Sequence, residues 1–111
     1  MILNQGRNTV RDLLRGAIDT VVIGTGTTSE TGADTGLEAQ IAEKTASLSN
    51  GATGVVVARG RLSVSEGNGN TIAEGGATIG GVLISRSAHS GLAKTSLVEA
   101  ETEITYRVVN V

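Results

Sequence analysis

The chain has 111 residues, the usual length of one domain, and nine basic against eleven acidic side chains give it a net charge of −2. Cys, Phe, Trp and Pro are absent, and Tyr106 is the only aromatic residue. The composition therefore excludes a disulfide framework, a thiolate metal site and an aromatic surface on which bases stack. The small negative charge argues against nucleic acid as a direct partner.

No stretch of the sequence is typical of a membrane protein or of an exported precursor. No apolar run approaches the roughly 18 residues of a membrane span. Residues 1–7 lack the apolar segment of a signal peptide. We therefore expect no membrane partner and no export by that route.

The apolar residues are almost all Ala, Val, Leu and Ile, and they are accompanied by 16 Gly and by many Thr and Ser. This composition is typical of strands joined by Gly-rich turns. Because aromatic side chains normally supply the largest blocks of buried area, the core is predicted to be thin. A thin core gains from neighbouring subunits, so we expect a homo-oligomer.

The first predicted element is a helix over residues 8–18. Apolar residues recur at helical spacing, and Asn8 is a suitable N-cap. Gly16 weakens this helix, so it is expected to dock its apolar stripe on a sheet. The members of that stripe are Val10, Leu13, Leu14 and Ala17.

A β-branched run over residues 19–23 predicts a strand that Gly24 ends. Residues 24–36 are polar or small and predict a long loop that orders only against a partner. Leu37, Ile41 and Ala42 then allow one or two helical turns within residues 36–44.

The rest of the chain predicts strands and turns. Residues 45–48 are weakly extended, and residues 53–64 form a strong strand in which Gly60 suggests a bulge or bend. Residues 67–70 predict a turn, and residues 71–87 a strand broken by two Gly-Gly pairs, at 75–76 and 80–81. Residues 87–94 are interpreted as a loop.

The last segment, residues 97–111, alternates between apolar and charged residues and predicts one long, half-buried strand. One face carries Val98, Ala100, Thr102, Ile104, Tyr106 and Val108, and the other carries Leu97, Glu99, Glu101, Glu103, Thr105 and Arg107. The order of elements predicts a single, mainly β domain over residues 1–111. Its expected form is a small antiparallel β-sandwich or barrel with one N-terminal helix.

Candidate catalytic and binding motifs are weak. The segment Gly24-Thr25-Gly26-Thr27-Thr28 follows a strand, as phosphate-binding loops do, but no Lys precedes Lys44 and no dinucleotide fingerprint is completed. His89 is the only His and stands among small polar residues, without a nucleophile elbow. We therefore predict no enzyme activity, no cofactor and no metal, and keep a small ligand-binding module that uses residues 24–28 as an alternative.

A calcium site formed by Asp19 or Asp34 with the turn that contains Asn68 and Asn70 is a further speculative alternative. The sequence contains no EF-hand loop that would support it.

Several short segments in order resemble structural proteins of tailed viruses. Such proteins are similar in carrying a strand that ends in GTGTT, a D-T-x-L turn, an E-x-x-K/R-like segment and an N-x-T-I-x-E-x-G hairpin. The matching segments here are residues 23–28, 34–37, 38–44 and 69–76, followed more weakly by residues 81–86 and by Lys94 ahead of the C-terminal strand.

The resemblance implies a virion component: a small β-rich domain of a tail, baseplate or tail fibre. Such a domain repeats around a symmetry axis, here expected as a trimer or a hexamer, and docks on other virion proteins. The alternative within the particle is a head decoration, turret or head–tail connector protein. The stretches expected to contact partners are the apolar start of the chain, the first Gly-rich loop, the 87–94 loop and the charged face of the last strand. The residues are Ile2, Leu3, Gly24, Thr25, Gly26, Thr27, Thr28, Leu92, Glu99, Glu101, Glu103 and Arg107, and the acidic members are expected to pair with Arg7, Arg11, Arg59, Arg61, Arg86 or Arg107 of a neighbour.

Overall fold

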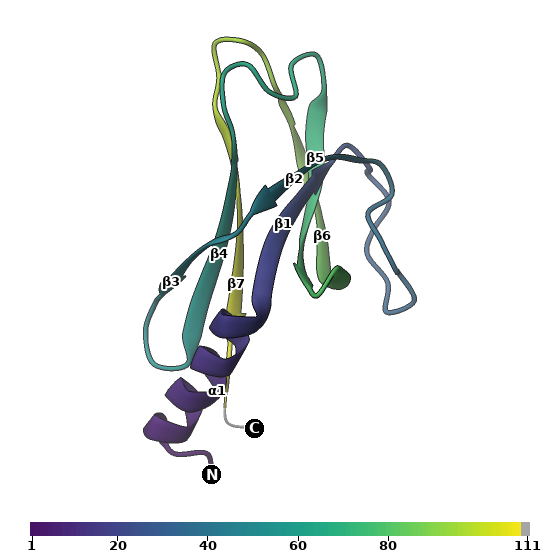
Figure 1. Cartoon of the computed structure of the whole chain (residues 1–111). Coiled ribbons are helices and arrows are strands. Elements are labelled where there is room, and N and C mark those ends of the chain that lie inside the picture. Colours follow the sequence, from purple (N-terminus) through teal and green to yellow (C-terminus); the bar gives the residue numbers. More distant parts are fainter. Residues whose placement is uncertain (110–111) are drawn as a thin grey trace.

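The computed structural model describes residues 1–109. Within these residues one helix and seven strands form two antiparallel sheets (Figure 1). The helix α1 spans Asn4–Ala17, and the strands are β1 (Ile18–Gly24), β2 (Gln40–Thr45), β3 (Ser47–Asn50), β4 (Val55–Leu62), β5 (Thr71–Ile79), β6 (Val82–Ala93) and β7 (Ala100–Arg107). No helix in this part of the chain has the length and hydrophobicity that crossing a membrane requires.

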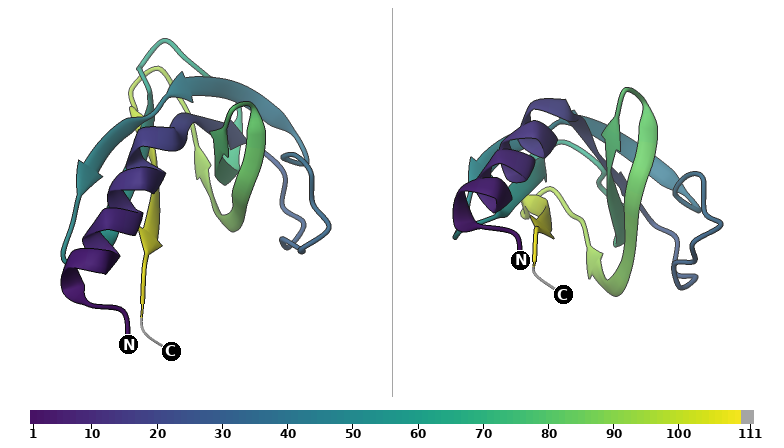
Figure 2. Two further views of the ribbon diagram at one scale, coloured as in Figure 1. Left: turned by 60° about the horizontal axis from the view of Figure 1, so that its bottom comes forward. Right: turned by 90° about the horizontal axis from the view of Figure 1, so that it is seen from below.

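The strands form a small β-sandwich, and at one corner a bent segment, which contains β2 and β3, connects the two sheets. The first sheet has the order β2-β1-β5-β6 and the second the order β3-β4-β7. Only Ala46 separates β2 from β3, and its backbone N–H donates to the carbonyl of Asp19 at 3.0 Å. This segment therefore lends one edge to each sheet (Figure 2). The predicted fold class, mainly β with one N-terminal helix, is confirmed.

The core is aliphatic, and glycines let the two sheets approach one another. A Cβ atom added to Gly60 of β4 would lie 2.8 Å from the Cβ of Val21 in β1, and one added to Gly75 of β5 would lie 2.5 Å from Thr102 in β7. Close approach at these points replaces the bulk that aromatic residues would supply. The predicted bulge at Gly60 is wrong, because the pairing of β4 with β7 keeps one register past that residue.

The helix begins at Asn4, four residues earlier than predicted, with Leu3 in the N-cap position. The predicted N-cap role of Asn8 is wrong. Its side-chain oxygen instead accepts a hydrogen bond from the backbone N–H of Gly54 at 2.9 Å. Asn8 thus ties the helix to the turn that precedes β4.

Only part of the predicted apolar stripe docks on the sheets. Leu14 packs against the core, whereas Val10, Leu13 and Ala17 are exposed. The expectation that the whole stripe covers a sheet is therefore wrong. Polar contacts occupy the inward side of the helix instead, including one from Arg7 Nε to the carbonyl of Val108 at 2.9 Å.

Two expected connections are strands. Residues 40–44, within the segment predicted to be helical, belong to β2 (Gln40–Thr45), which pairs with β1. Residues 87–93, predicted as a loop, complete β6, which pairs with β5. Of the two predicted breaks, Gly80-Gly81 forms the hairpin turn with positive φ at both residues, while β5 continues through Gly75-Gly76. Hydrogen bonding to a neighbouring strand determines the extended conformation of these segments, and the periodicity of the sequence carries no information about that pairing.

The C-terminal strand starts later than predicted, at Ala100, because residues 95–98 form a turn in which the Val98 N–H donates to the Thr95 carbonyl at 3.2 Å. Its alternation is confirmed: Ala100, Thr102, Ile104 and Tyr106 are buried or half-buried, and the residues between them are exposed. The last two residues of the predicted strand lie outside the described residues.

Candidate functional site

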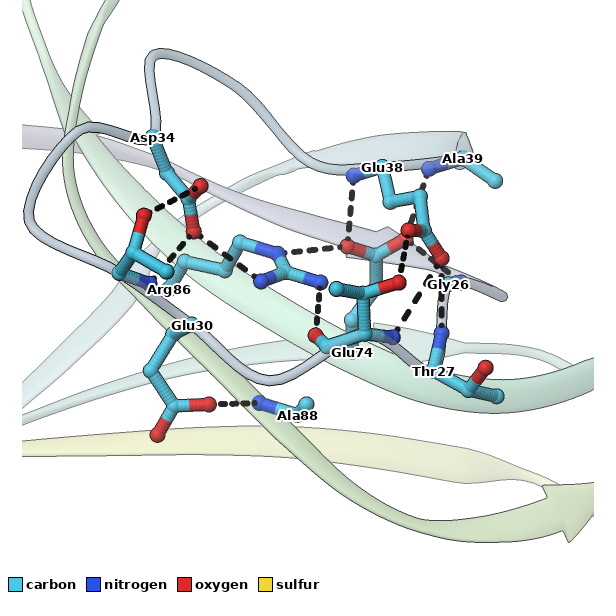
Figure 3. A network of polar contacts seen from close by, with 11 residues as sticks. Gly26, Thr27, Glu30, Asp34, Glu38, Ala39, Glu74, Arg86 and Ala88 are labelled. Carbon is cyan, nitrogen blue, oxygen red and sulfur yellow. Dashed lines mark hydrogen bonds and ion pairs between the residues drawn. The ribbon is translucent and has the colours of Figure 1, made fainter.

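The loop of residues 25–39, called here the 25–39 loop, is held on the first sheet by a buried carboxylate. Glu74 lies in β5 and has no exposed surface. Its Oε2 accepts hydrogen bonds from the backbone N–H groups of Gly26, at 2.6 Å, and Ala39, at 2.8 Å. Its Oε1 accepts one from the N–H of Glu38, at 2.8 Å. Both ends of the loop are thereby fastened to one side chain (Figure 3).

Arg86 of β6 completes the attachment. Its side chain is only 5% exposed, and its Nε donates to Glu74 Oε1 at 3.0 Å. Nη1 donates to Asp34 at 3.1 Å and Nη2 to the carbonyl of Thr28 at 2.7 Å. All three guanidinium nitrogens therefore bind either Glu74 or the loop that Glu74 holds. The hydrogen bond to Glu74 raises the pKa of Arg86 above its usual value, since the cation is the bound form.

Two further carboxylates bind the outer part of the loop. Glu38 accepts hydrogen bonds from the backbone N–H of Thr27 at 3.0 Å, from that of Thr28 at 3.4 Å and from the Thr28 hydroxyl. Glu30 accepts one from the N–H of Ala88 in β6 at 3.2 Å. We refer to Glu30, Asp34, Glu38, Glu74 and Arg86 together as the Glu74 cluster.

The buried carboxyl of Glu74 is ionised. Burial by itself raises its pKa, but the hydrogen bonds from the backbone of Ala39, from Arg86 and from the backbones of Glu38 and Gly26 outweigh burial. The pKa of Glu74 consequently lies below its ordinary value. A buried charge of this kind is stable only while its partners stay in place, so the loop and the sheet depend on each other.

The glycines of the GTGTT segment make room for Glu74. A Cβ atom on Gly26 would lie 2.4 Å from Glu74 Oε2, and one on Gly24 would lie 2.6 Å from the carbonyl of Ala39 and 2.7 Å from Glu74 Oε2. Neither position tolerates a side chain without movement of its neighbours. These two predicted contact residues are buried within their own chain and offer no contact surface.

The donors of this loop are occupied. The N–H groups of Thr25, Gly26, Thr27 and Thr28 donate to the Ala39 carbonyl, Glu74 and Glu38. A phosphate-binding loop needs such N–H groups free and no carboxylate beside them, so the arrangement opposes binding of an anion at residues 24–28. Thr27 and Thr28 keep exposed surface, and Thr25 is half-buried.

Asp34 and Asp19, which were considered above as calcium ligands, accept hydrogen bonds from groups of the same chain. Asp34 accepts hydrogen bonds from Thr31 and Arg86, whereas Asp19 accepts them from Thr78 and from the backbone of Gly80. No cluster of His, Asp or Glu side chains suited to a metal ion occurs within residues 1–109.

The acidic row of β7 pairs within the chain. Arg59 of β4 lies 3.0 Å from Glu103 and 3.5 Å from Glu101, and Arg61 lies 3.3 Å from Glu101 and 3.7 Å from Glu99. These ion pairs cross from β4 to β7 on the outer face. Within one chain, Glu99, Glu101 and Glu103 therefore already have arginine partners, and such exposed pairs add little stability.

The other predicted contact residues lie apart from the Glu74 cluster. Ile2 and Leu3 precede the helix and are 43% and 60% exposed. Leu92, predicted in a loop, belongs to β6 and lines a cavity of about 250 Å³ between β5, β6 and β7, together with His89. Arg107 is exposed at the end of β7.

Sequence reasoning missed Glu74 as a site residue, and it considered Arg86 only as a partner of the acidic residues near the C-terminus. Glu74 appeared only as one letter of a hairpin pattern, although its neighbours gave a signal. It is the single charge in β5, where small and apolar residues surround it, and β5 is buried along most of its length. A charged residue in such a strand needs a specific partner, which identifies it as a candidate for a structural or functional role.

The segments that carry the resemblance stated above meet in this cluster. GTGTT supplies Gly24 and Gly26, the D-T-x-L turn supplies Asp34, the next segment begins with Glu38, and the hairpin supplies Glu74. In comparisons with known proteins, no protein-family model matches the chain, and no curated protein matches it at a significant level.

Proposed function

We propose that the chain is a non-enzymatic structural subunit of a tailed virus particle, placed in the tail, the baseplate or the attachment of a tail fibre. One observation carries the proposal. The short segments that resemble tailed-virus structural proteins are scattered from residue 23 to residue 86, yet they converge on the Glu74 cluster, where each has a definite task. That convergence gives the resemblance a physical basis.

The chemistry of the cluster favours a structural role over a catalytic one. Glu74, Glu38 and Arg86 have their charged atoms engaged with one another and with backbone groups of the loop. A general acid or base needs access to substrate, and a fully buried carboxylate that accepts four hydrogen bonds has none. The cluster therefore serves to anchor the loop.

The surface favours assembly. Many large apolar side chains are exposed at separate places, among them Leu13 of the helix, Val82 at the hairpin and Leu97 at the far turn. Scattered exposed apolar residues are ordinary, but a chain whose core lacks large aromatic side chains gains stability by burying them against neighbours. Repetition around an axis makes individually weak contacts sufficient.

Fractionation of particles tests the proposal. Particles produced from the genome that encodes the chain are purified, separated into heads and tails, and analysed by mass spectrometry for peptides of this protein. We expect the chain in the tail fraction at a fixed ratio to other tail proteins, with antibody labelling at the same site. Its presence in heads alone would replace the tail position by the head alternative, and its absence from particles would refute the proposal.

A further inference from the structure

The two sheets of the sandwich are unequal, with four strands in the first and three in the second. β1 lies across from β4, since a Cβ atom on Gly60 would meet Val21 at 2.8 Å. β5 lies across from β7, since one on Gly75 would meet Thr102 at 2.5 Å. β6 is the next strand beyond β5, so no strand of the second sheet lies opposite it within residues 1–109 (Figure 2).

A cavity marks part of the vacant place opposite β6. It has a volume of about 250 Å³, lies between β5, β6 and β7, and has Ile72, Leu92 and Ile104 in its apolar lining. Nearer the hairpin of β5 and β6, the hydroxyl of Tyr106 is hydrogen-bonded to that of Ser85. The side of β6 that faces the second sheet therefore borders open space over part of its length.

The free edge of β7 beside this cavity offers unpaired backbone groups. The Val108 N–H donates to the Gly54 carbonyl at 2.9 Å, in the register of β4 and β7. In an antiparallel pair, residues that bond to the partner strand alternate with residues whose N–H and C=O groups point away from it. The residues of β7 that point away from β4 are therefore Glu101, Glu103, Thr105 and Arg107. Within residues 1–109 no hydrogen bond reaches these outward groups, and Glu101 and Glu103 border the cavity.

The other sheet edges are irregular, short or occupied. β2 loses its register with β1 at Gly24 and bends into β3, which has only four residues. The pairing of β6 with β5 shifts at two places, and the Ala88 N–H of β6 is bound by Glu30. Among the edge strands of residues 1–109, β7 alone keeps one register over eight residues. Because irregular and short edges resist the addition of a strand, β7 is the edge open to one.

We propose that the place beside β7 receives one extended segment of another protein, which pairs with β7 and becomes the fourth strand of the second sheet. The free N–H and C=O groups of β7 specify a polypeptide backbone as the occupant. Alternate side chains of the segment point towards β6 and into the cavity, whose lining selects apolar residues. The proposal deepens the proposed function, on which it rests only in taking the partner to be another protein of an assembly.

The charges beside β7 select the outward side chains of the segment. The acidic row has three carboxylates for two arginines, Arg59 and Arg61, so one carboxylate is in excess there. Arg107 is exposed at the other end of the strand. An antiparallel segment therefore matches β7 when an acidic residue lies opposite Arg107 and basic residues lie opposite Glu103 and Glu101.

The β7 strand of a second copy does not fit this place. Pairing of two β7 edges about a twofold axis would put the β6 of each copy across from the β7 of the other, where that copy already has its own β5. The two first sheets would then overlap. The occupant is instead a segment with no second sheet packed on it, such as a terminal arm or an extended loop of the partner.

A synthetic peptide tests the proposal. The probe is Glu-Val-Thr-Val-Lys-Val-Lys with blocked ends, which places its glutamate opposite Arg107 and its two lysines opposite Glu103 and Glu101 in the antiparallel register. We expect calorimetric titration to give a Kd below about 1 mM. In the control peptide, proline replaces threonine, which removes an N–H that faces β7 and keeps the charge, and binding should weaken at least about tenfold. No binding of the probe at about 5 mM, or equal binding of the control, would overturn the proposal.

Amide exchange followed by NMR locates the bound peptide. The N–H groups of Glu103 and Thr105 point to the open edge and are expected to exchange fast in the free chain. Those of Thr102 and Ile104 bond to β4 and are expected to exchange slowly with or without peptide. The peptide should slow the first pair at least about tenfold. Slow exchange of that pair in the free chain, or slowing confined to other residues, would refute the open edge.

Two variants test the part that the cavity plays. Leu92→Glu brings a carboxylate into the lining and is expected to weaken binding of the probe at least about tenfold. Because Leu92 is itself 45% exposed, this substitution is expected to leave the fold intact. Leu97→Glu is the matched control, since it adds the same charge at a residue that is 91% exposed and outside the cavity. Equal affinities of the two variants would refute the place assigned to the segment.

Failure of this docking is distinguishable from failure of the proposed function. A chain that is found in tails but does not bind the probe docks by another surface, which refutes the strand position and leaves the virion role intact. A chain that binds the probe at β7 and is absent from particles keeps the docking site and loses the role.

Discussion

The 25–39 loop and the exposed apolar side of α1 show opposite relations between composition and environment. That side, called here the helix flank, is formed by Val10, Leu13 and Ala17. The loop consists largely of polar and small residues, yet carboxylates of the same chain bind the backbone N–H groups at both of its ends, and Gly26 is buried. The helix flank is apolar, yet Leu13 and Val10 face solvent. The polar loop finds hydrogen-bond partners for the ends of its backbone within the chain, whereas the apolar side of the helix is left without apolar contacts.

The difference shows where a contact surface is to be sought. A long Gly-rich loop suggests flexibility and partner binding, but one ionised side chain, Glu74, fixes this loop from the inside. An amphipathic helix suggests docking on its own sheet, but polar contacts hold this helix and its apolar strip stays uncovered. Satisfaction of hydrogen bonds and of apolar surface, rather than polarity alone, separates internal segments from interfaces.

The largest effect is expected from Glu74→Gln. The amide cannot accept all four hydrogen bonds, and it leaves Arg86 buried without its main counter-ion. We expect the free energy of unfolding, measured by urea denaturation, to fall by about 3–5 kcal/mol. Glu103→Gln, in an exposed ion pair, is the control and is expected to cost less than about 1 kcal/mol. Equal losses of stability in the two variants would contradict the claim that Glu74 holds the 25–39 loop on the first sheet.

Acid should destabilise the folded protein through Glu74 and through Glu66, which lies outside the Glu74 cluster and pairs with Lys44. The Lys44 hydrogen bond, with others from Ser63, lowers the pKa of Glu66 from 4.5 to about 2, and the pKa of Glu74 is lowered as well. A carboxyl with a lowered pKa contributes stability that is fully present above its unfolded pKa and is lost as the pH falls towards its folded pKa. The free energy of unfolding should be flat from pH 7 to about 5 and decline between about 4.5 and 2.

The Glu74→Gln variant separates the part of this decline that belongs to the cluster. Because it lacks one carboxyl that takes up a proton on acid unfolding, its stability is expected to depend less steeply on pH than that of the unaltered chain. Denaturant unfolding at a series of pH values measures both slopes. Identical slopes would show that the pKa of Glu74 is the same in the folded and the unfolded protein, which would contradict the lowered pKa.

A smaller loss is expected from Gly26→Ala. The added methyl group would lie 2.4 Å from Glu74 Oε2, so the loop must move away from its anchor. We expect a cost of about 1–3 kcal/mol in the free energy of unfolding. Gly32→Ala in the same loop is the control, because a Cβ atom there meets nothing within 4 Å, and its effect should stay within about 0.5 kcal/mol. An unchanged free energy of unfolding in Gly26→Ala would contradict the close contact between the loop and Glu74.

The smallest effects distinguish two neighbouring leucines of the helix. Leu14 packs against the core, and Leu14→Ala is expected to cost about 1–2 kcal/mol in thermal or urea unfolding of the dilute chain. Leu13 is 70% exposed, and Leu13→Ala should cost less than about 0.5 kcal/mol under the same conditions. A larger loss of stability in Leu13→Ala than in Leu14→Ala would contradict the finding that the helix is attached by the side that bears Leu14.

Local patterns predicted those parts of the fold in which local and tertiary preferences agree. The alternation in residues 100–107 predicted both the strand and its inward face, because one side of β7 is buried or half-buried along its whole length and the other is exposed. The helical spacing predicted α1 but not which residues face the sheets, since Leu14 and Leu13 both belong to the same apolar stripe. Only the polar contacts of Arg7 and Asn8 decide between them.

Failures arose where a distant strand determines the conformation. Leu37, Ile41 and Ala42 have spacing that a helix permits, but β1 recruits residues 40–45 as a partner strand. Small and polar residues around Gly91 suggested a loop, but β5 holds them as an edge strand. The Glu74 cluster joins residues separated by up to 58 positions, as in the bond from Arg86 to Thr28, and no local pattern records such a pairing.

Amide hydrogen exchange at two protein concentrations tests the contrast between the two regions most directly. The N–H groups of Gly26, Glu38 and Ala39, which donate to Glu74, are expected to exchange slowly and equally at low and high concentration. The N–H groups of α1 are expected to gain protection as the concentration rises and the helix flank becomes covered. Fast exchange of the three loop groups in dilute protein, with protection appearing only on assembly and no change in α1, would contradict the account. The loop would then be the interface and the helix a surface that stays exposed.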